Sequence, residues 1–347
     1  MSDGTVAVSY HTLGHEQPMS FVGIRALEPE RPSSDVACIY LPGRYANSTP
    51  LTEDGAEDIR AHLAHAGFRV YSVDYRTHLL DEEAADAVDM CAAWRTRDFL
   101  EDVAVAAGWV RARTDRAPLI LVAHSMGVKL AYLLAARASL RPAGLVALDG
   151  WLRVPDPEQH GGERAFVREA LERWRSGEVR VYEAFDDVPA VRARLARALD
   201  APTDREGAAF RRFVAGTLGR ARGAGRLTAL PARPEDVDRL LRTLLGYDRY
   251  WPAAQVLELR SAALGIHEPE LEPFDDDLAK IDVPLLNVVA AARGEPFVER
   301  SRFTAGLCRN APRTELVLDG FGHLDVVASR RVEEAVARPV AEWLARL

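Results

Sequence analysis

The stretch that decides the fold is Leu119-Ile120-Leu121-Val122-Ala123-His124-Ser125-Met126-Gly127. A short apolar run leads directly into Ser125, and the residues two before and two after it, Ala123 and Gly127, are small. This pattern is typical of a strand-to-helix turn so tight that the serine hydroxyl stands clear of the sheet, where a base can reach it. Residues 128–136 contain neither Gly nor Pro and predict the helix that follows. Ser125 is therefore the candidate nucleophile.

A candidate base for this serine lies near the C-terminus. Residues 314–318 have the pattern of a strand, and Asp319-Gly320-Phe321-Gly322-His323-Leu324-Asp325 follows them. A histidine that serves a serine on such a turn lies late in the chain, on a loop after the last strand, and the glycines let this loop reach the serine. We therefore predict that His323 is the base. Asp325 follows too closely to orient the ring and is expected to cap a helix or to bond within the loop.

With these motifs, the chain resembles the α/β-hydrolase family. The resemblance rests on the turn at Ser125, on the segment 322–325 and on the order of the strands around them, and it covers most of the chain except the middle. It implies an α/β fold with an eight-stranded, mostly parallel sheet flanked by helices, a Ser-His-acid triad and a variable cap. Serine rather than aspartate at the turn argues against the dehalogenase and epoxide-hydrolase branches, which need a carboxylate nucleophile.

The acid of the triad has two candidates. Residues 283–290 read as the strand before the acid loop, and in the family that loop often carries a glycine followed by an acid. Gly294 and Glu295 occupy those places. Glu295 is therefore the preferred acid, which would orient the imidazole and stabilise its cation. The alternative is Asp149, at the end of the strand predicted over 144–148, because some family members carry their acid there.

Two backbone N–H groups are needed to hold the oxyanion that forms when an ester or amide is attacked. One belongs to Met126, the residue after the nucleophile, and the other to the loop after the third strand, which is predicted over 36–41. Gly43 in that loop lets the backbone turn so that the N–H of Arg44 points at the site. The side chains of Arg44 and Tyr45 are candidates for substrate contact, and so is His124, which precedes the serine.

The remaining pattern divides the chain into a core and an insertion. Strands and helices alternate through residue 150 and again from 282 onward, which predicts a parallel sheet with helices on its faces. The core therefore comprises 1–150 and 282–347. Residues 151–281 break the alternation and read as a mainly helical cap, with helices expected over 164–174, 188–199, 205–218 and 235–245.

Aromatic residues in the insertion are candidates for substrate contact. Trp151 follows the C-terminal end of a strand, the edge at which this kind of fold places its site. Tyr250 and Trp251 belong to a cluster that forms a second candidate wall. Together they predict a mid-sized to bulky hydrophobic acyl substrate.

Composition narrows the class of protein. The chain has 347 residues, of which 48% are hydrophobic, a net charge of −8 and a pI of about 5.7. These values fit one large catalytic domain with an insertion and give no basic excess for a nucleic acid. Arginine far outnumbers lysine, which occurs only at positions 129 and 280. No dinucleotide, phosphate-loop or metal-ligand spacing occurs, so no cofactor and no metal are expected.

We expect the protein to be cytoplasmic and not bound to a membrane. Its N-terminal residues lack the charged start and apolar run of a signal peptide. No run of about 18 apolar residues is present to cross a bilayer. Cys38, Cys91 and Cys308 have no spacing that suggests a disulfide framework, which fits a reducing compartment.

The resulting hypothesis is a serine hydrolase that cleaves an ester, lactone or thioester through an acyl-enzyme on Ser125. An acyltransferase or cyclase would use the same acyl-enzyme with a hydroxyl or amine in place of water, and the sequence does not separate the two. A ligand-binding protein on the same fold is a third hypothesis, against which the pair of Ser125 and His323 argues.

Overall fold

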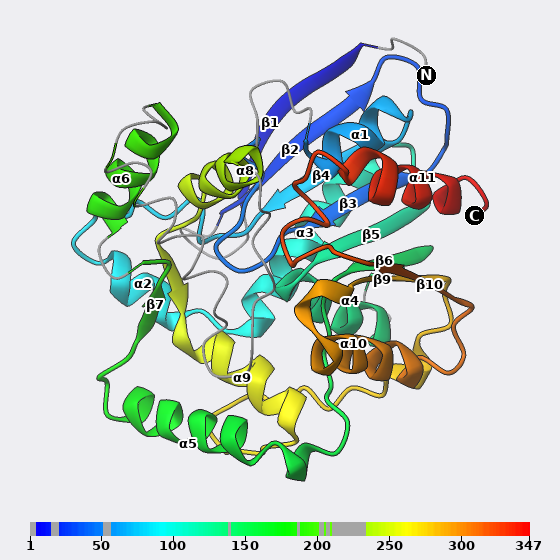
Figure 1. The fold of residues 1–347 in the computed structure, drawn as a ribbon. Helices are drawn as coiled ribbons and strands as arrows, with labels where there is room; N and C mark the ends of the chain where they lie inside the picture. The colour runs from blue at the N-terminus through cyan, green and yellow to red at the C-terminus, as the bar shows by residue number, and fades with distance from the viewer. Residues whose placement is uncertain are drawn as a thin grey trace.

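An eight-stranded sheet runs through the centre of the molecule (Figure 1). This computed structural model describes residues 5–14, 21–50, 57–137, 140–185, 188–200, 205, 209 and 234–347. The strand order is β1-β2-β4-β3-β5-β6-β9-β10. The first two pairs, β1/β2 and β2/β4, are antiparallel and the others parallel, which confirms the predicted fold class. The strands are β1 (Val6–Gly14), β2 (Phe21–Pro29), β3 (Ala37–Leu41), β4 (Arg69–Asp74), β5 (Leu119–His124), β6 (Gly144–Leu148), β9 (Leu285–Ala290) and β10 (Arg313–Leu318).

Helices cover both faces of this sheet (Figure 1). The pleat sends Ile39 and Leu41 of β3 to one face and Cys38 and Tyr40 to the other. Because both faces are covered, the central strands are apolar throughout instead of alternating with polar residues. The first face carries α3 (Thr96–Arg113), α4 (Met126–Ala136) and α10 (Glu295–Leu307), and the second carries α1 (Ile59–His65), the π-helical turn η4 (Glu333–Ala337) and α11 (Arg338–Leu344).

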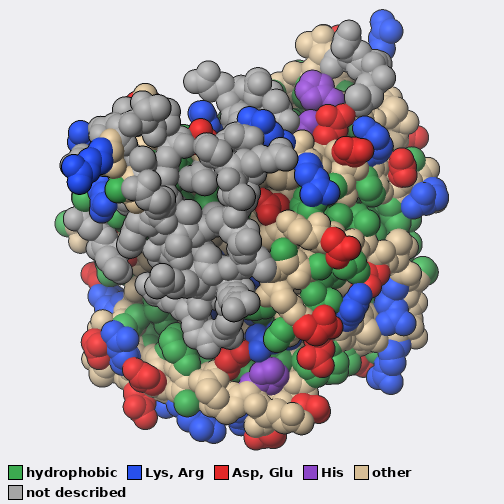
Figure 2. Space-filling view, in the orientation of Figure 1, with side chains coloured by type: hydrophobic (Ala, Val, Ile, Leu, Met, Phe, Trp, Pro, Cys, Tyr) green, Lys and Arg blue, Asp and Glu red, His purple; other side chains and the backbone are tan. Residues whose placement is uncertain are grey.

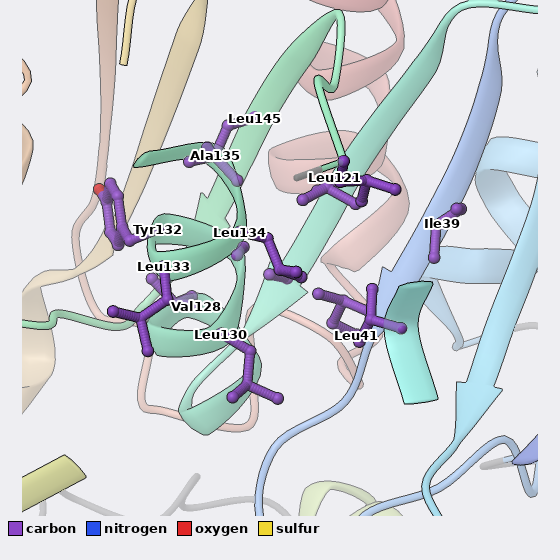
Figure 3. Packing of buried hydrophobic residues seen from close by; sticks show 14 of the residues in the cluster. Ile39, Leu41, Leu121, Val128, Leu130, Tyr132, Leu133, Leu134, Ala135 and Leu145 are labelled. Carbon is purple, nitrogen blue, oxygen red and sulfur yellow. The ribbon is translucent and has the colours of Figure 1, made fainter. Parts of the chain in front are cut away.

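Helix α4 is almost entirely buried, and this fixes the position of the residue before it. Leu130 and Leu134 are at most 2% exposed and pack in the cluster that Figure 3 shows with Leu41 of β3 and Leu121 of β5. Burial of each such leucine contributes roughly 1.5–3 kcal/mol of hydrophobic stabilisation. The helix cannot shift on the sheet without losing these contacts, so Ser125 at its N-terminal end keeps a fixed position beside β5.

Helices and one small sheet lie between β6 and β9. The helices expected over 164–174, 188–199 and 235–245 are present, and the one expected over 205–218 lies outside the described residues except at positions 205 and 209. The elements are η1 (Pro157–Gln159), α5 (Gly161–Arg175), β7 (Val181–Glu183), α6 (Val188–Asp200), α8 (Pro234–Leu245), β8 (Tyr250–Pro252), α9 (Ala253–Leu264) and η2 (Leu278–Lys280). Strands β7 and β8 pair antiparallel.

Helix α9 links this inserted segment to the core. It contacts α3 and α5, and its Val256 and Leu259 belong to the same cluster of buried residues as α3 and α4. Most of its side chains are buried, so its sequence has no polar stripe that would distinguish it from a core strand. For this reason the sequence pattern did not predict helix α9.

The described surface is mixed in charge. Figure 2 shows Lys and Arg side chains interspersed with Asp and Glu over the described part of one face. Among the described residues, no helix is both long and apolar enough to cross a membrane. The three cysteines are buried and form no disulfide with one another.

Candidate active site

Ser125 occupies a strained turn between β5 and α4. Its φ is 56° and its ψ −114°, a conformation that non-glycine residues rarely adopt. A Cβ placed on Gly127 would lie 2.3 Å from the carbonyl oxygen of Leu41, so only glycine fits there. The backbone N–H of Ser125 donates to the carbonyl of Leu148 at 3.1 Å. These contacts hold the serine above the ends of the parallel strands, as the sequence motif predicts.

A chain of hydrogen bonds joins Ser125, His323 and Asp149. The Ser125 hydroxyl donates to His323 Nε2 at 2.8 Å, and His323 Nδ1 lies 2.5 Å from Asp149 Oδ2. An ionised carboxylate only accepts hydrogen bonds, so Nδ1 carries the proton and Nε2 is free to accept one. This is the geometry of a serine activated by an oriented base.

The structure places Asp149, and not Glu295, against His323. Asp149 directly follows β6 with a φ of 48°, and its Oδ1 accepts from the backbone N–H of Ala290 at 3.2 Å. Glu295 is the first residue of α10, and its side chain is exposed. The prediction that Glu295 is the acid beside His323 is therefore wrong. The loop after β9 turns through η3 (Ala291–Arg293) before α10 begins, and this turn leaves Glu295 away from the imidazole.

The same turn supplies Arg293, a site residue that sequence reasoning did not identify. Its Nη1 donates to Asp149 Oδ2 at 2.8 Å, and its guanidinium carbon lies 4.0 Å from the ring centroid of Phe297 and 5.3 Å from that of Trp151. Cation–π contacts of this kind stabilise a partly desolvated arginine. Arg293 and Asp149 are 144 positions apart in the chain, and no local motif links them.

The charges around His323 set its protonation. Burial lowers the pKa of His323, and the nearby Arg293 cation lowers it further, against the opposing effect of Asp149. Burial alone would raise the pKa of Asp149, but Arg293 and the bond to His323 outweigh it and bring that pKa to about 2. Asp149 is therefore ionised and His323 neutral near pH 7, which are the states a base and its orienting acid require.

His124 lies beneath the site instead of facing a substrate. It is 3% exposed, and its Nε2 donates to the backbone carbonyl of His323 at 2.9 Å. The two imidazole rings are 4.6 Å apart, centroid to centroid. Burial and the neighbouring imidazole lower the pKa of His124 to about 3, so it remains neutral. His124 thus holds the backbone of the His323 loop, and the expectation of direct substrate contact is corrected.

The loop after β3 abuts Ser125, as the oxyanion-hole prediction requires. A Cβ placed on Gly43 would lie 3.0 Å from the Cβ of Ser125, so this glycine gives the loop its close approach. Met126 is the first residue of α4, where backbone N–H groups have no partner within the helix. Arg44 follows Gly43 directly in this loop. The N–H groups of Met126 and Arg44 remain our predicted donors to an oxyanion.

Two of the aromatic residues predicted to contact substrate, Trp251 and Tyr250, are buried in separate clusters. Trp251 is fully buried, donates to Gln255 at 2.7 Å and packs with Tyr75 and Phe99, so it belongs to the core. Tyr250 is 7% exposed and packs in a separate cluster with α2 (Ala87–Ala93). Neither is a wall of the site.

Two of the predicted substrate-contact residues remain partly exposed. Tyr45, with a φ of 64°, lies edge-on to Trp251 at 5.7 Å, centroid to centroid. Trp151 packs edge-on to Phe297 at 5.4 Å. Both lie on segments that adjoin the Ser125 turn or Asp149, so both remain candidates for substrate contact.

Two other features of the described chain lie apart from Ser125 or hold no ligand set. A cavity of about 640 Å³ is bordered by α9, the loop after it and Phe303, and none of Ser125, His323 or Asp149 lines it. In the described part of the chain, no three or more His, Cys, Asp or Glu side chains are arranged to hold a metal ion. The hydrogen-bonded chain at Ser125 is therefore the candidate site.

Comparison with known proteins gives one family match and several similar folds. The sequence model of the alpha/beta hydrolase fold family matches residues 39–327. Similar solved structures include a candidate lipase from Sulfolobus solfataricus, with 18% identity, a TM-score of 0.70 and coverage of 98% of this chain and 94% of that one. A thioesterase domain from the curacin biosynthetic pathway has 16% identity, a TM-score of 0.51 and coverage of 98% and 99%.

A carboxyl esterase from Bacillus coagulans has 14% identity, a TM-score of 0.55 and coverage of 99% of both chains. No curated protein matches by sequence. At these identities the structural likeness concerns the fold alone. The family match, however, spans most of the chain and includes Ser125, Asp149 and His323. The chain therefore belongs to the alpha/beta hydrolase fold family.

Proposed function

We propose that the protein is a serine hydrolase that cleaves an ester, lactone or thioester through an acyl-enzyme on Ser125. The observation that carries this proposal is the pair of hydrogen bonds from Ser125 Oγ to His323 Nε2 and from His323 Nδ1 to Asp149 Oδ2. The strained backbone of Ser125 supports it, because strain of this kind is maintained where a side chain must be presented to a reactant.

In the first half of the proposed reaction, Ser125 Oγ attacks the carbonyl carbon while its proton passes to His323 Nε2. The N–H groups of Met126 and Arg44 hold the oxyanion. When the intermediate collapses, the bond to the leaving group breaks and the leaving group takes the proton from His323. Asp149 stabilises the imidazolium that exists between these two transfers.

In the second half, water attacks the acyl carbonyl and gives a proton to His323. The bond from the acyl carbon to Ser125 Oγ then breaks, the serine recovers the proton, and a carboxylic acid leaves. The described helices between β6 and β9 are proposed to act as a cap, in the division 1–150 and 282–347 for the core and 151–281 for the cap. Trp151 would then belong to the substrate pocket, because it lies two residues after Asp149 and packs edge-on against Phe297.

The proposal is tested by labelling and turnover together. A fluorophosphonate probe should add one label to the intact protein, and peptide mapping should place it on Ser125. Substitution Ser125→Ala should abolish labelling and lower the turnover of a 4-nitrophenyl ester by about 10³-fold or more, because a triad acts as a unit. A Ser125→Ala variant that folds and keeps most of its activity would exclude the covalent mechanism.

A further inference from the structure

Three cationic residues lie on three separate elements: α4, the loop after β3, and α9. Lys129 lies on α4 one turn after Ser125, about 6 Å along the helix axis. Arg44 belongs to the loop that abuts Ser125. Arg260 lies on α9 directly after Leu259, whose carbonyl oxygen accepts from Lys129 Nζ at 3.5 Å. All three side chains are partly exposed.

The three cations are close enough to repel one another. Burial lowers the pKa of Lys129, and the charges of Arg260 and Arg44 lower it further, to about 7. Arg153 and Arg300 add smaller effects in the same direction. Burial and the charge of Arg44 also lower the pKa of Arg260, to about 10. Burial and the neighbouring arginines therefore both disfavour the charged form of Lys129.

No acid of the described chain neutralises this cluster of Lys129, Arg44 and Arg260. The Nε atom of Arg44 is buried and has no hydrogen-bond partner, and Arg260 stacks over the exposed ring of Phe166 at 4.8 Å. The contact of Lys129 Nζ with a single carbonyl leaves two of its three N–H groups for other partners. Glu163 acts on Arg260 from a distance but is bonded to Arg300.

By contrast, the buried arginines of the described chain are paired with carboxylates. Arg76 is bonded to Asp102 at 2.7 Å, and Arg239 lies 2.9 Å from Glu57. An unpaired, partly desolvated set of cations destabilises the folded state, and groups of this kind are concentrated at sites that bind a ligand of opposite charge. Guanidinium and ammonium groups are also the usual partners of carboxylates and phosphates.

We propose that the substrate carries an anionic group within a few bonds of the carbonyl that Ser125 attacks, and that Lys129, Arg44 and Arg260 bind it. A carboxylate, a phosphate monoester or a sulfate monoester has the required chemistry. This proposal rests on the proposed acyl-enzyme function. It replaces the purely hydrophobic pocket that Tyr250 and Trp251 suggested, since both of these side chains are buried.

The test compares esters that differ in one charge. The first pair is the 4-nitrophenyl monoester of adipic acid and its methyl ester, which place the charge or its neutral equivalent on the acyl part. The second pair is 4-nitrophenyl hexanoate and 3-carboxy-4-nitrophenyl hexanoate, which place it on the leaving group. A third arm, 4-nitrophenyl 6-(phosphonooxy)hexanoate, distinguishes phosphate from carboxylate. We expect kcat/KM to be higher for the charged member of at least one pair and to fall toward the neutral value with added salt.

The variants Lys129→Met and Arg260→Gln should each lower the ratio of charged to neutral kcat/KM by about tenfold, the usual effect of losing one hydrogen bond to a charged group. Two variants are used so that a folding defect in one leaves the other informative. Lys280→Met is the matched control, because it removes the chain's other lysine, which is exposed on η2, and should leave the ratio unchanged.

The outcomes separate the two proposals. If wild-type protein cleaves the neutral esters but prefers no charged ester, the anion site is excluded and the acyl-enzyme function stands. A charged-ester preference that survives both variants excludes Lys129 and Arg260 as its cause and overturns the three-residue site. If no ester is cleaved and the fluorophosphonate leaves Ser125 unlabelled, the proposed function fails, and the anion site that rests on it fails as well.

Discussion

Arg293 and His323 share one carboxylate oxygen. Oδ2 of Asp149 accepts from Arg293 Nη1 at 2.8 Å and lies 2.5 Å from His323 Nδ1. The arginine therefore neutralises part of the charge that would stabilise a protonated His323. A base with a lower pKa stays unprotonated in more acidic solution, so the protein is expected to retain activity on the acidic side of neutrality.

Substitution of Arg293 should move the acidic limb of the pH profile. The Arg293 cation lowers the pKa of His323, so Arg293→Met should raise that pKa and shift the rise of kcat/KM to higher pH. Arg302→Met, which removes an exposed arginine of α10 that pairs with Glu315, serves as the control. An unchanged limb, or one displaced to lower pH, would mean that Arg293 does not act on the base. Profiles with a neutral 4-nitrophenyl ester measure this.

The two candidate acids should differ sharply in effect. Asp149→Asn removes the charge that orients His323 and stabilises its cation, so we expect kcat to fall by about 10³-fold or more. Glu295→Gln alters an exposed side chain at the start of α10 and should change kcat little. Circular dichroism verifies the fold of each variant. A severe loss with Glu295→Gln, together with a mild loss with Asp149→Asn, would reverse the assignment.

His124 should make the folded protein sensitive to acid. Its pKa is about 3 in the folded state and near 6.5 when unfolded, so the unfolded chain binds more protons between these values. This contribution to stability is therefore lost progressively as the pH falls below about 6.5. His124→Gln keeps an N–H donor for the His323 carbonyl and cannot take up a proton. Urea denaturation from pH 7 to pH 4 should show a shallower loss of stability than in wild type.

The control for this measurement is His267→Gln, at an exposed position on the loop after α9. It should follow the wild-type dependence on pH. If His124→Gln also follows wild type, burial of His124 does not determine the acid sensitivity.

The preference for a charged ester should depend on pH through Lys129. Burial and the charges of Arg260 and Arg44 bring its pKa to about 7, with smaller effects from Arg153 and Arg300. Lys129 is charged below that value, so the ratio of kcat/KM for the adipate monoester over its methyl ester should be highest near pH 6. It should fall as the pH rises through about 7 and level off at the contribution of the arginines. Because the titration of His323 affects kcat/KM for both esters equally, it cancels in this ratio.

In Lys129→Met the ratio should be low and independent of pH. A slope that persists in this variant would assign the titration to another group. The methionine keeps the apolar stem of the lysine, so packing along α4 should be preserved.

Local sequence was sufficient to predict the position of a side chain when that position depends on a single turn. The small residues around Ser125 and the glycines before His323 predicted where both side chains lie, because each motif is complete within a few positions. The acid was harder to place, since strands β6 and β9 are neighbours in the sheet and the ends of both offer a carboxylate. Only the path of η3 decides between Asp149 and Glu295.

Residues that act through long-range contacts were not predictable in this way. Arg293 meets Asp149 because β6 and β9 pair, and the sequence of neither segment indicates that partner. Trp251 looked like a pocket residue because aromatic residues cluster around it, but the pairing of β7 with β8 and the packing of α9 place it in the core. Burial of this kind depends on tertiary packing, which outweighs local pattern.

The hydrogen bond between Ser125 and His323 joins residues 198 positions apart, and the one between His323 and Asp149 spans 174. Contacts of such high sequence separation require large loops to close, and they form late when a chain folds. Helices such as α3 and α4 need only local contacts. During refolding, helical circular dichroism should therefore recover before cleavage of a 4-nitrophenyl ester, and the lag between the two signals would measure how late β9 and β10 join the sheet.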